Sequence, residues 1–168
     1  MAQNKTRVVT TYLEMVERPA DIPSGNPEGA LIMRANRPTV SFYRFLYNTV
    51  GEHWKWVDRR KLSDEDLRTI IHDEKVEVHV LYMNGVPAGY VELDFRQIND
   101  VEISYFGLMP DFIGQGSGKL FLQWAIKTAW QTNPKRLWVH TCSLDHPGAL
   151  QLYQKCGFKI YKTEEHEV

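Results

Sequence analysis

Residues Glu102 to Leu122 read EISYFGLMPDFIGQGSGKLFL, and this segment decides how the chain folds. The pattern predicts a β-strand, a turn at Pro110, a loop with glycines at 114, 116 and 118, and then a helix. Alternate glycines let a loop bring its backbone N–H groups close to a ligand, and a helix that begins there adds the positive end of its dipole. The segment therefore predicts an anion site, with phosphate as the expected anion.

Two well-known phosphate loops do not fit the spacing. The P-loop motif would need Gly at position 113 and Ser or Thr at position 120, where this chain has Ile113 and Leu120. The dinucleotide fingerprint counted from Gly114 would need Gly at position 119, which is Lys119, and the loop does not open the first strand–helix unit. A third kind of phosphate loop, or a glycine-rich turn without a ligand, remains open on this segment alone.

A second motif narrows the choice. Asp145 to Phe158 read DHPGALQLYQKCGF, and helical spacing places residues 149, 152, 153 and 156 on one face. The glycine loop followed by this segment resembles the GNAT (Gcn5-related N-acetyltransferase) superfamily, whose members bind acetyl-coenzyme A at the loop. The resemblance covers residues 76–160 well, whereas residues 1–75 match only in the order of their elements.

The fold expected from residue patterns has the order β-α-α-β-β-β-α-β-α-β. Strands are predicted at 7–17, 76–83, 86–95, 101–108, 136–143 and 158–162, and helices at 38–50, 63–72, 116–130 and 147–156. Asn84-Gly85 predicts a tight hairpin between two of the strands, and residues 21–29 predict a loop. We expect an α/β (α+β mixed) GNAT fold: a central, mostly antiparallel mixed sheet with helices on both faces.

Length and composition bound the remaining possibilities. The 168 residues predict a single acyltransferase domain, 1–168, with an acceptor-side part at about 1–75 and a coenzyme-binding part at about 76–160. The net charge of −1 argues against nucleic acid and membrane surfaces as partners, and the N-terminal residues MAQNKTRVV lack the apolar core of a signal peptide. Two cysteines, Cys142 and Cys156, predict buried thiols in a cytoplasmic protein. A homodimer is compatible with these properties.

The resemblance implies a set of coenzyme-binding residues. Backbone groups near the end of the strand would hold the pantetheine, and the loop amides would hold the phosphates, with Lys119 as a supporting cation. The expected residues are Leu108, Met109, Ile113, Gly114, Gln115, Gly116, Ser117, Gly118, Lys119, His146 and Ala149. Ile113 and His146 depart from the family pattern, which has Arg or Gln at the first position and Asn at the second.

The resemblance also implies the catalytic groups. Glu102 lies in VEISYFGL, which is similar to the family segment that carries a catalytic Glu, and is the expected general base. Tyr153 is the expected general acid, because a phenol and a thiol have similar pKa values. Glu92 and Asp94 alternate on the preceding strand and are the alternatives to Glu102, or residues that line the acceptor site.

The acyl acceptor is the least determined partner. The aromatic segment 38–60, which includes the first predicted helix, suggests that Tyr43, Trp54 and Trp56 help to bind a small-molecule or peptide amine. The six histidines show no metal-ligand spacing, so no metal is expected. The expected function is acetyl transfer from acetyl-coenzyme A to a primary amine by direct attack in a ternary complex. The alternative is a GNAT-fold module that binds or senses acyl-coenzyme A without catalysis.

Overall fold

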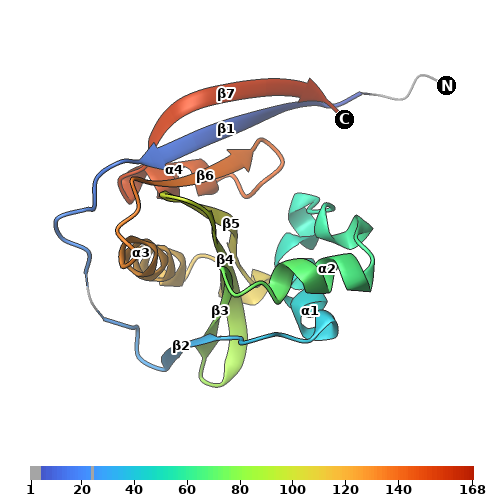
Figure 1. The fold of residues 1–168 in the computed structure, drawn as a ribbon, viewed down its shortest axis with the longest axis horizontal. Coiled ribbons are helices and arrows are strands. Elements are labelled where there is room, and N and C mark those ends of the chain that lie inside the picture. Colours follow the sequence, from blue (N-terminus) through green and yellow to red (C-terminus); the bar gives the residue numbers. More distant parts are fainter. Residues whose placement is uncertain (1–4, 24) are drawn as a thin grey trace.

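The computed structural model describes residues 5–23 and 25–168, which form a seven-stranded sheet in the order β2-β3-β4-β5-β6-β1-β7 (Figure 1). The strands are β1 (Arg7–Met15), β2 (Ala30–Arg34), β3 (Val76–Met83), β4 (Val86–Gln97), β5 (Asp100–Leu108), β6 (Arg136–Cys142) and β7 (Lys159–Glu167). The helices are α1 (Val40–Gly51), α2 (Asp64–Ile71), α3 (Ser117–Trp130) and α4 (Ala149–Lys155). Two parts of the chain lie outside the described residues. They are residues 1–4, which begin the N-terminal segment without a signal-peptide pattern, and Ser24, which belongs to the predicted loop.

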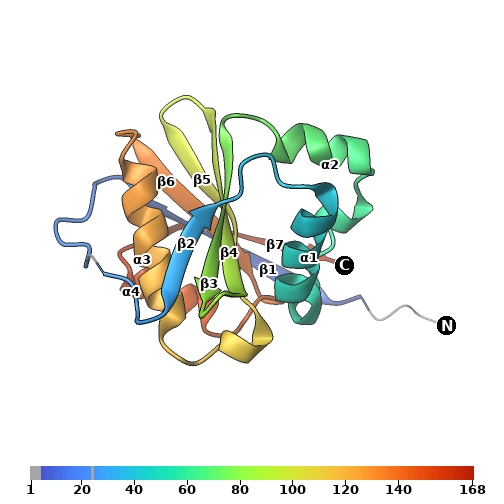
Figure 2. The ribbon, with the colours of Figure 1, turned by 90° about the horizontal axis from the view of Figure 1, so that it is seen from below.

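The helices cover both faces of the sheet, as Figures 1 and 2 show. Helices α1 and α2 pack on one face through a buried cluster that includes Tyr43, Leu46 and Leu67. Helices α3 and α4 pack on the other face through a cluster that includes Phe121 and Tyr153. All neighbouring strands are antiparallel except β5 and β6. The predicted fold class, a mostly antiparallel mixed sheet between helices, is confirmed.

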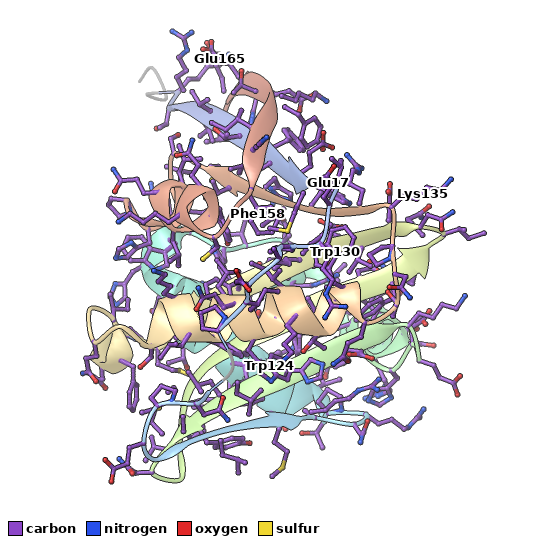
Figure 3. All side chains as sticks on the ribbon, turned by 90° about the vertical axis from the view of Figure 1, so that its left-hand side faces the viewer. Glu17, Trp124, Trp130, Lys135, Phe158 and Glu165 are labelled. Carbon is purple, nitrogen blue, oxygen red and sulfur yellow. The ribbon has the colours of Figure 1, made fainter. Side chains whose placement is uncertain are left out.

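Aromatic residues fix α3 to its face of the sheet. Figure 3 views this side and labels Trp124 and Trp130 of α3 together with Phe158, which follows α4. Trp124 meets the ring of His79 on β3 edge-on, with the ring centroids 4.9 Å apart. The Trp130 indole N–H lies 3.3 Å from the sulfur of Met15 at the end of β1. These contacts hold the helix that begins at the glycine loop in a fixed position over the sheet.

Local signals in the sequence correctly located several elements. Ser63 caps α2 by accepting a hydrogen bond from the Asp66 backbone N–H at 3.1 Å. Asn84 and Gly85 both have positive φ, at 51° and 83°, as a type I′ hairpin turn requires. None of the described helices is long and apolar enough to cross a membrane.

Three sequence-based expectations need correction. Strand β2 was not predicted, because its five residues are mostly exposed and it is defined by antiparallel pairing with β3. Strand β7 extends to Glu167 rather than ending at residue 162, because pairing with β1 keeps a charged, fully exposed segment extended. Cys142 and Cys156 are half-buried free thiols rather than fully buried ones.

The divergence of β5 from β6 creates the space for a site. Their parallel pairing runs from Asp100 opposite Arg136 to Ile103 opposite Val139 and then stops, although β5 continues to Leu108. A register shift between β4 and β5 leaves Ser104 as an extra residue at this point. Backbone groups on this edge of β5 therefore face a gap instead of a neighbouring strand.

Candidate active site

A cavity of about 870 Å³ lies where β5 and β6 diverge. Its walls come from the second half of β5, the end of β6, the glycine loop, the start of α4 and the segment after α1. This volume is within the range of typical small-molecule sites. Segments far apart in the sequence thus form one continuous site.

The glycine loop forms one end of this cavity. Gly114 and Gly116 have φ angles of 85° and 83°, in the left-handed region that favours glycine, and a Cβ added at either position would meet no atom within 4 Å. Helix α3 begins at Ser117 with Gly116 as its N-cap and has no side-chain cap. Its first N–H groups therefore have no side-chain partner, which is the arrangement that binds anions at a helix N-terminus.

Most of the residues expected to hold the coenzyme line this cavity. They are Leu108, Ile113, Gly114, Gly116, Gly118, Lys119, His146 and Ala149. The side chain of Gln115 instead donates to the Asp111 carbonyl at 3.1 Å, and Ser117 is buried. These two residues can contribute to the site through their backbone N–H groups.

Met109 is a correction to the sequence-based set. Its N–H donates to the Ala88 carbonyl at 2.8 Å, and its carbonyl accepts from the Phe112 N–H at 2.9 Å. Its side chain is buried in the cluster under α1 and α2. The Met109 N–H is therefore not free for a ligand, because its pairing with β4 extends one residue beyond β5.

Glu102 lies in the cavity on the face of β5 that carries α1 and α2. Its side chain is 25% exposed, and its carboxylate lies 3.9 Å from Nε2 of His140 on β6. Burial raises the pKa of Glu102 to about 7, with further contributions from the negative charges of Asp94 and Glu92. Asp94 on β4 is paired with Glu102 on the neighbouring strand β5, so the two side chains lie next to each other on the same face of the sheet.

Glu92 is buried, which contradicts its placement in the acceptor site. The Tyr43 hydroxyl donates to one of its oxygens at 2.5 Å, and the Arg59 guanidinium donates to the other at 2.7 Å. Glu92 is 1% exposed and does not line the cavity, and Tyr43 is fully buried as well. Both residues support Arg59, which does reach the cavity and lies over the ring of Tyr105.

Asp94 reaches the cavity but is held by a neighbour. Its two carboxylate oxygens accept three hydrogen bonds from the Arg96 side chain, at 2.7 to 3.1 Å. Burial raises the pKa of Asp94, but the hydrogen bonds and charge of Arg96 outweigh that effect and leave the pKa below its usual value. Asp94 is thus a poor proton acceptor, and Glu102 is the cavity carboxylate best suited to be a base.

Trp54 and Trp56 line the cavity and connect its two sides. The Trp56 indole N–H donates to the Asp145 carboxylate at 3.1 Å, and Trp54 meets the His146 ring edge-on at 5.0 Å. Gly51 permits this packing, because a Cβ at that position would lie 2.5 Å from Trp56. The segment after α1 is therefore held against the loop that precedes α4.

Tyr153 lies on α4 with its side chain 5% exposed and contributes to the cavity wall. Burial, followed by the charge of Asp145, raises its pKa well above the usual value. The phenol is therefore protonated at neutral pH, as a proton donor must be. No hydrogen bond contributes to this shift, so the hydroxyl has no partner among the described residues.

Sequence reasoning did not identify His140 or Tyr105 as cavity residues. No local pattern marks them, because each reaches the site through the pairing of β5 with β6 or through the packing of the segment after α1. Among the described residues, no group of three or more His, Cys, Asp or Glu side chains is arranged to hold a metal ion.

Comparison with known proteins shows that solved acetyltransferase structures share this fold. A GCN5-related N-acetyltransferase from Sphaerobacter thermophilus superposes with a TM-score of 0.71 at 14% identity, over 98% of this chain and 52% of that chain. An aminoglycoside acetyltransferase from an uncultured soil metagenomic sample, in complex with sisomicin, gives 0.63 at 13% identity, over 77% and 88%. An IAA acetyltransferase from Bacillus cereus gives 0.59 at 23% identity, over 79% of each chain.

The chain spans 52% to 63% of the length of three of the similar solved structures. No curated protein matches it. The likeness to solved structures establishes the fold, and a family model carries the assignment further. Because the model for the acetyltransferase (GNAT) family matches residues 43–158, which is more than half of the chain, this protein belongs to that family.

Proposed function

We propose that the protein is an N-acetyltransferase that transfers an acetyl group from acetyl-coenzyme A to a primary amine by direct attack in a ternary complex. One observation carries the proposal: a helix N-terminal anion site and a carboxylate with a raised pKa, Glu102, line the same cavity. Family membership supports acetyl transfer in general.

The residues of the cavity fit the coenzyme. The N–H groups of residues 114–118, at the start of the uncapped helix α3, would hold the pyrophosphate with help from Lys119. The edge of β5 from Ser104 to Leu108 has no strand partner on the β6 side and would hold the pantetheine arm. His146 and Ala149 line the opposite wall. When bound, the coenzyme supplies the acetyl thioester.

Glu102 would remove a proton from the acceptor ammonium. An alkylammonium has a pKa near ~10.4 and a free glutamate near ~4.3, so that transfer would be unfavourable by about six pK units. The raised pKa of about 7 narrows the gap to roughly three units. The same shift leaves about half of the molecules with ionised Glu102 at neutral pH, ready to accept a proton.

Tyr153 would donate a proton to the departing thiolate. Its raised pKa makes the phenol a weaker acid than the sequence alone suggests. Burial raises the pKa of a thiol in the same way, and so a thiolate released in this cavity becomes a stronger base. The two pKa values then stay close enough for transfer.

We propose that Trp54, Trp56 and Asp94 form the acceptor side of the cavity, with Arg59 beneath it. The acceptor is a small-molecule or peptide amine. The solved structures with this fold include an aminoglycoside acetyltransferase and an IAA acetyltransferase, so the fold does not select one acceptor. We further propose that residues 1–168 act as one domain, with an acceptor side that includes Asp94 and Glu102 as well as part of residues 1–75.

The test is incubation with acetyl-coenzyme A and a panel of amines, amino acids, aminoglycosides and peptides, followed by detection of free thiol. We expect thiol release that depends on an amine and falls in the Glu102→Gln variant. Thermal stabilisation by coenzyme A measures binding separately. Stabilisation with no turnover on any acceptor would favour the non-catalytic sensing module, and absence of both would contradict the coenzyme site.

A further inference from the structure

We propose that His140 is a proton-relay residue that carries the proton accepted by Glu102 out to solvent. The inference rests on the proposed function, because it takes Glu102 as the base. It adds a second group to the acceptor side of the reaction and gives a role to a histidine that no sequence motif marks.

The sheet topology brings the two side chains together. β5 and β6 are parallel, Glu102 is opposite Trp138, and the pairing ends one residue later at Ile103 and Val139. His140 is thus the first residue of its face beyond the last paired position, and its ring lines the same cavity as Glu102. The 3.9 Å between Nε2 and the carboxylate oxygen is a separation that one water molecule or a small side-chain rotation closes.

The difference in solvent exposure between Glu102 and His140 explains why a proton relay is useful. Glu102 is 25% exposed and His140 is 45% exposed. An acceptor amine placed for proton transfer stands in front of Glu102 and covers the surface that connects it to water. The more exposed His140 ring then keeps a path from the carboxyl group to solvent.

The other groups around Glu102 cannot take the proton. Asp94, across β4, is bound by Arg96, and these contacts hold its pKa below the usual range. Glu92 is buried and paired with Arg59. The two arginines are permanently protonated. Among the described residues near Glu102, His140, with Nε2 at 3.9 Å from the carboxylate, is therefore the neighbour whose ring nitrogen can accept the proton.

The surroundings of His140 keep its ring neutral at pH 7. Burial lowers its pKa below 6.5, and the charges of Asp145 and Asp58 oppose that effect only in part. Tyr12 on β1 packs against the ring at 5.6 Å, and Trp138 on the same strand packs at 6.2 Å. A neutral ring can accept a proton.

The proton balance is consistent with this role. An ammonium loses two protons when it becomes an amide, and the thiolate takes up one proton, so each turnover releases one proton. In the proposal, the amine lone pair attacks the thioester after Glu102 has taken the first proton. The carboxyl group passes this proton to Nε2 of His140, and the imidazolium loses it to water. Tyr153 gives its proton to the thiolate, and the second proton that the amine nitrogen loses restores the phenol.

Chemical rescue of His140→Ala tests the relay in turnover. We expect kcat to fall about tenfold, the KM values for both substrates to change less than about twofold, and added imidazole to restore kcat in proportion to its concentration. Tyr153→Phe should not respond to imidazole. His53→Ala, which changes an exposed histidine outside the cavity lining, is the matched control and should behave as wild type. Wild-type kcat in His140→Ala, or a loss that imidazole does not reverse, would overturn the relay.

An NMR titration of the His140 ring tests the pair without turnover. We expect its chemical shift to follow two ionisations in the wild type and one in Glu102→Gln. An identical titration curve in both proteins would overturn the proposal even if the enzyme is active. If no amine on the panel is acetylated, the proposed function fails, whereas a coupled titration still supports the Glu102–His140 pair.

Discussion

Three carboxylates on one face of the neighbouring strands β4 and β5 differ in their burial and in their ion-pair partners. Glu92 is buried and paired with Arg59, and Asp94 is bound by Arg96. Glu102 reaches the cavity, and its basic neighbour within ion-pair distance among the described residues is the neutral His140. The residue type is nearly the same in each case, so the neighbours decide the chemistry. Glu102 has the raised pKa because burial and two nearby negative charges act on it together.

We expect Glu102 to destabilise the folded protein at neutral pH. Its native pKa of about 7 lies above the reference value of 4.5, so the native state binds more protons than the unfolded chain between these values. The contribution of Glu102 to the free energy of unfolding is therefore most favourable below pH 4.5 and is lost as pH rises to 7. The total loss is up to about 3 kcal/mol. We expect Glu102→Gln to be more stable than wild type at pH 8, with the difference shrinking toward pH 4.5, as measured by thermal or urea unfolding.

Asp94→Asn is the matched control of opposite sign. The pKa of Asp94 is lowered, so its contribution is present above 3.8 and is lost as pH falls through the native value. This variant should be less stable than wild type at pH 8. A Glu102→Gln variant that is no more stable than wild type at pH 8 would show that Glu102 titrates normally.

Tyr153→Phe should separate chemistry from binding. The hydroxyl has no hydrogen-bond partner among the described residues, so its removal leaves no buried group unpaired and should change stability by less than about 0.5 kcal/mol. We expect kcat to fall tenfold or more while the affinity for coenzyme A, measured by calorimetry, stays within about twofold. Tyr161→Phe, on exposed β7, is the control. Equal kcat values for Tyr153→Phe and wild type would remove the acid from the mechanism.

At the scale of elements, the glycine loop and α3 form one unit. Left-handed glycines at 114 and 116 turn the chain so that α3 begins with its N–H groups facing the cavity. An added Cβ at either glycine would point into open space, so packing does not require glycine at these positions. Glycine is required by the left-handed backbone conformation and by access for a ligand. The hairpin turn at Gly85 has the same φ of 83° and the same open surroundings, but lies at the β3–β4 connection.

Gly116→Ala and Gly85→Ala should therefore differ only in coenzyme binding. Each places a Cβ on a left-handed residue, which costs about 1–2 kcal/mol of stability. At position 116 the methyl group also stands in the loop that is proposed to hold phosphate. We expect calorimetry to show at least tenfold weaker coenzyme A binding for Gly116→Ala and unchanged binding for Gly85→Ala. Equal affinities in the two variants would contradict the assignment of the loop.

At the scale of the whole molecule, β1 completes the sheet. The strand nearest the N-terminus lies between β6 and β7, which are the last two strands of the chain (Figure 1). Leu13 and Met15 on β1 are buried in the cluster under α3 and α4. The packing of α3 and α4 on the sheet thus depends on residues of β1.

Leu13→Ala should show this dependence. Leu13 is fully buried, and removing its side chain leaves a cavity that costs about 2–5 kcal/mol. Val16→Ala changes a residue just beyond β1 that is 62% exposed, and its effect should stay within about 0.5 kcal/mol. Urea unfolding measures both free energies. Similar small losses in the two variants would mean that β1 contributes little to the folded core.

Local patterns in the sequence determined the elements whose signals lie within a few residues. The capped start of α2, the Asn84-Gly85 turn, the glycine loop and the helix after it are all set by backbone preferences of nearby residues. The two motifs in order were also sufficient to indicate the family, because each combines several residue types at fixed spacing.

Only the tertiary structure decided which carboxylate reaches the cavity and which residues stand beside it. Glu92 and Glu102 have the same side chain, and their different burial comes from α1 and Arg59 packing over one of them. The approach of His140 to Glu102 requires β5 and β6 to pair in parallel and then diverge, and this pairing joins residues 36 positions or more apart. Sequence spacing carries no record of such contacts, because they arise when the sheet closes and the helices bury its two faces.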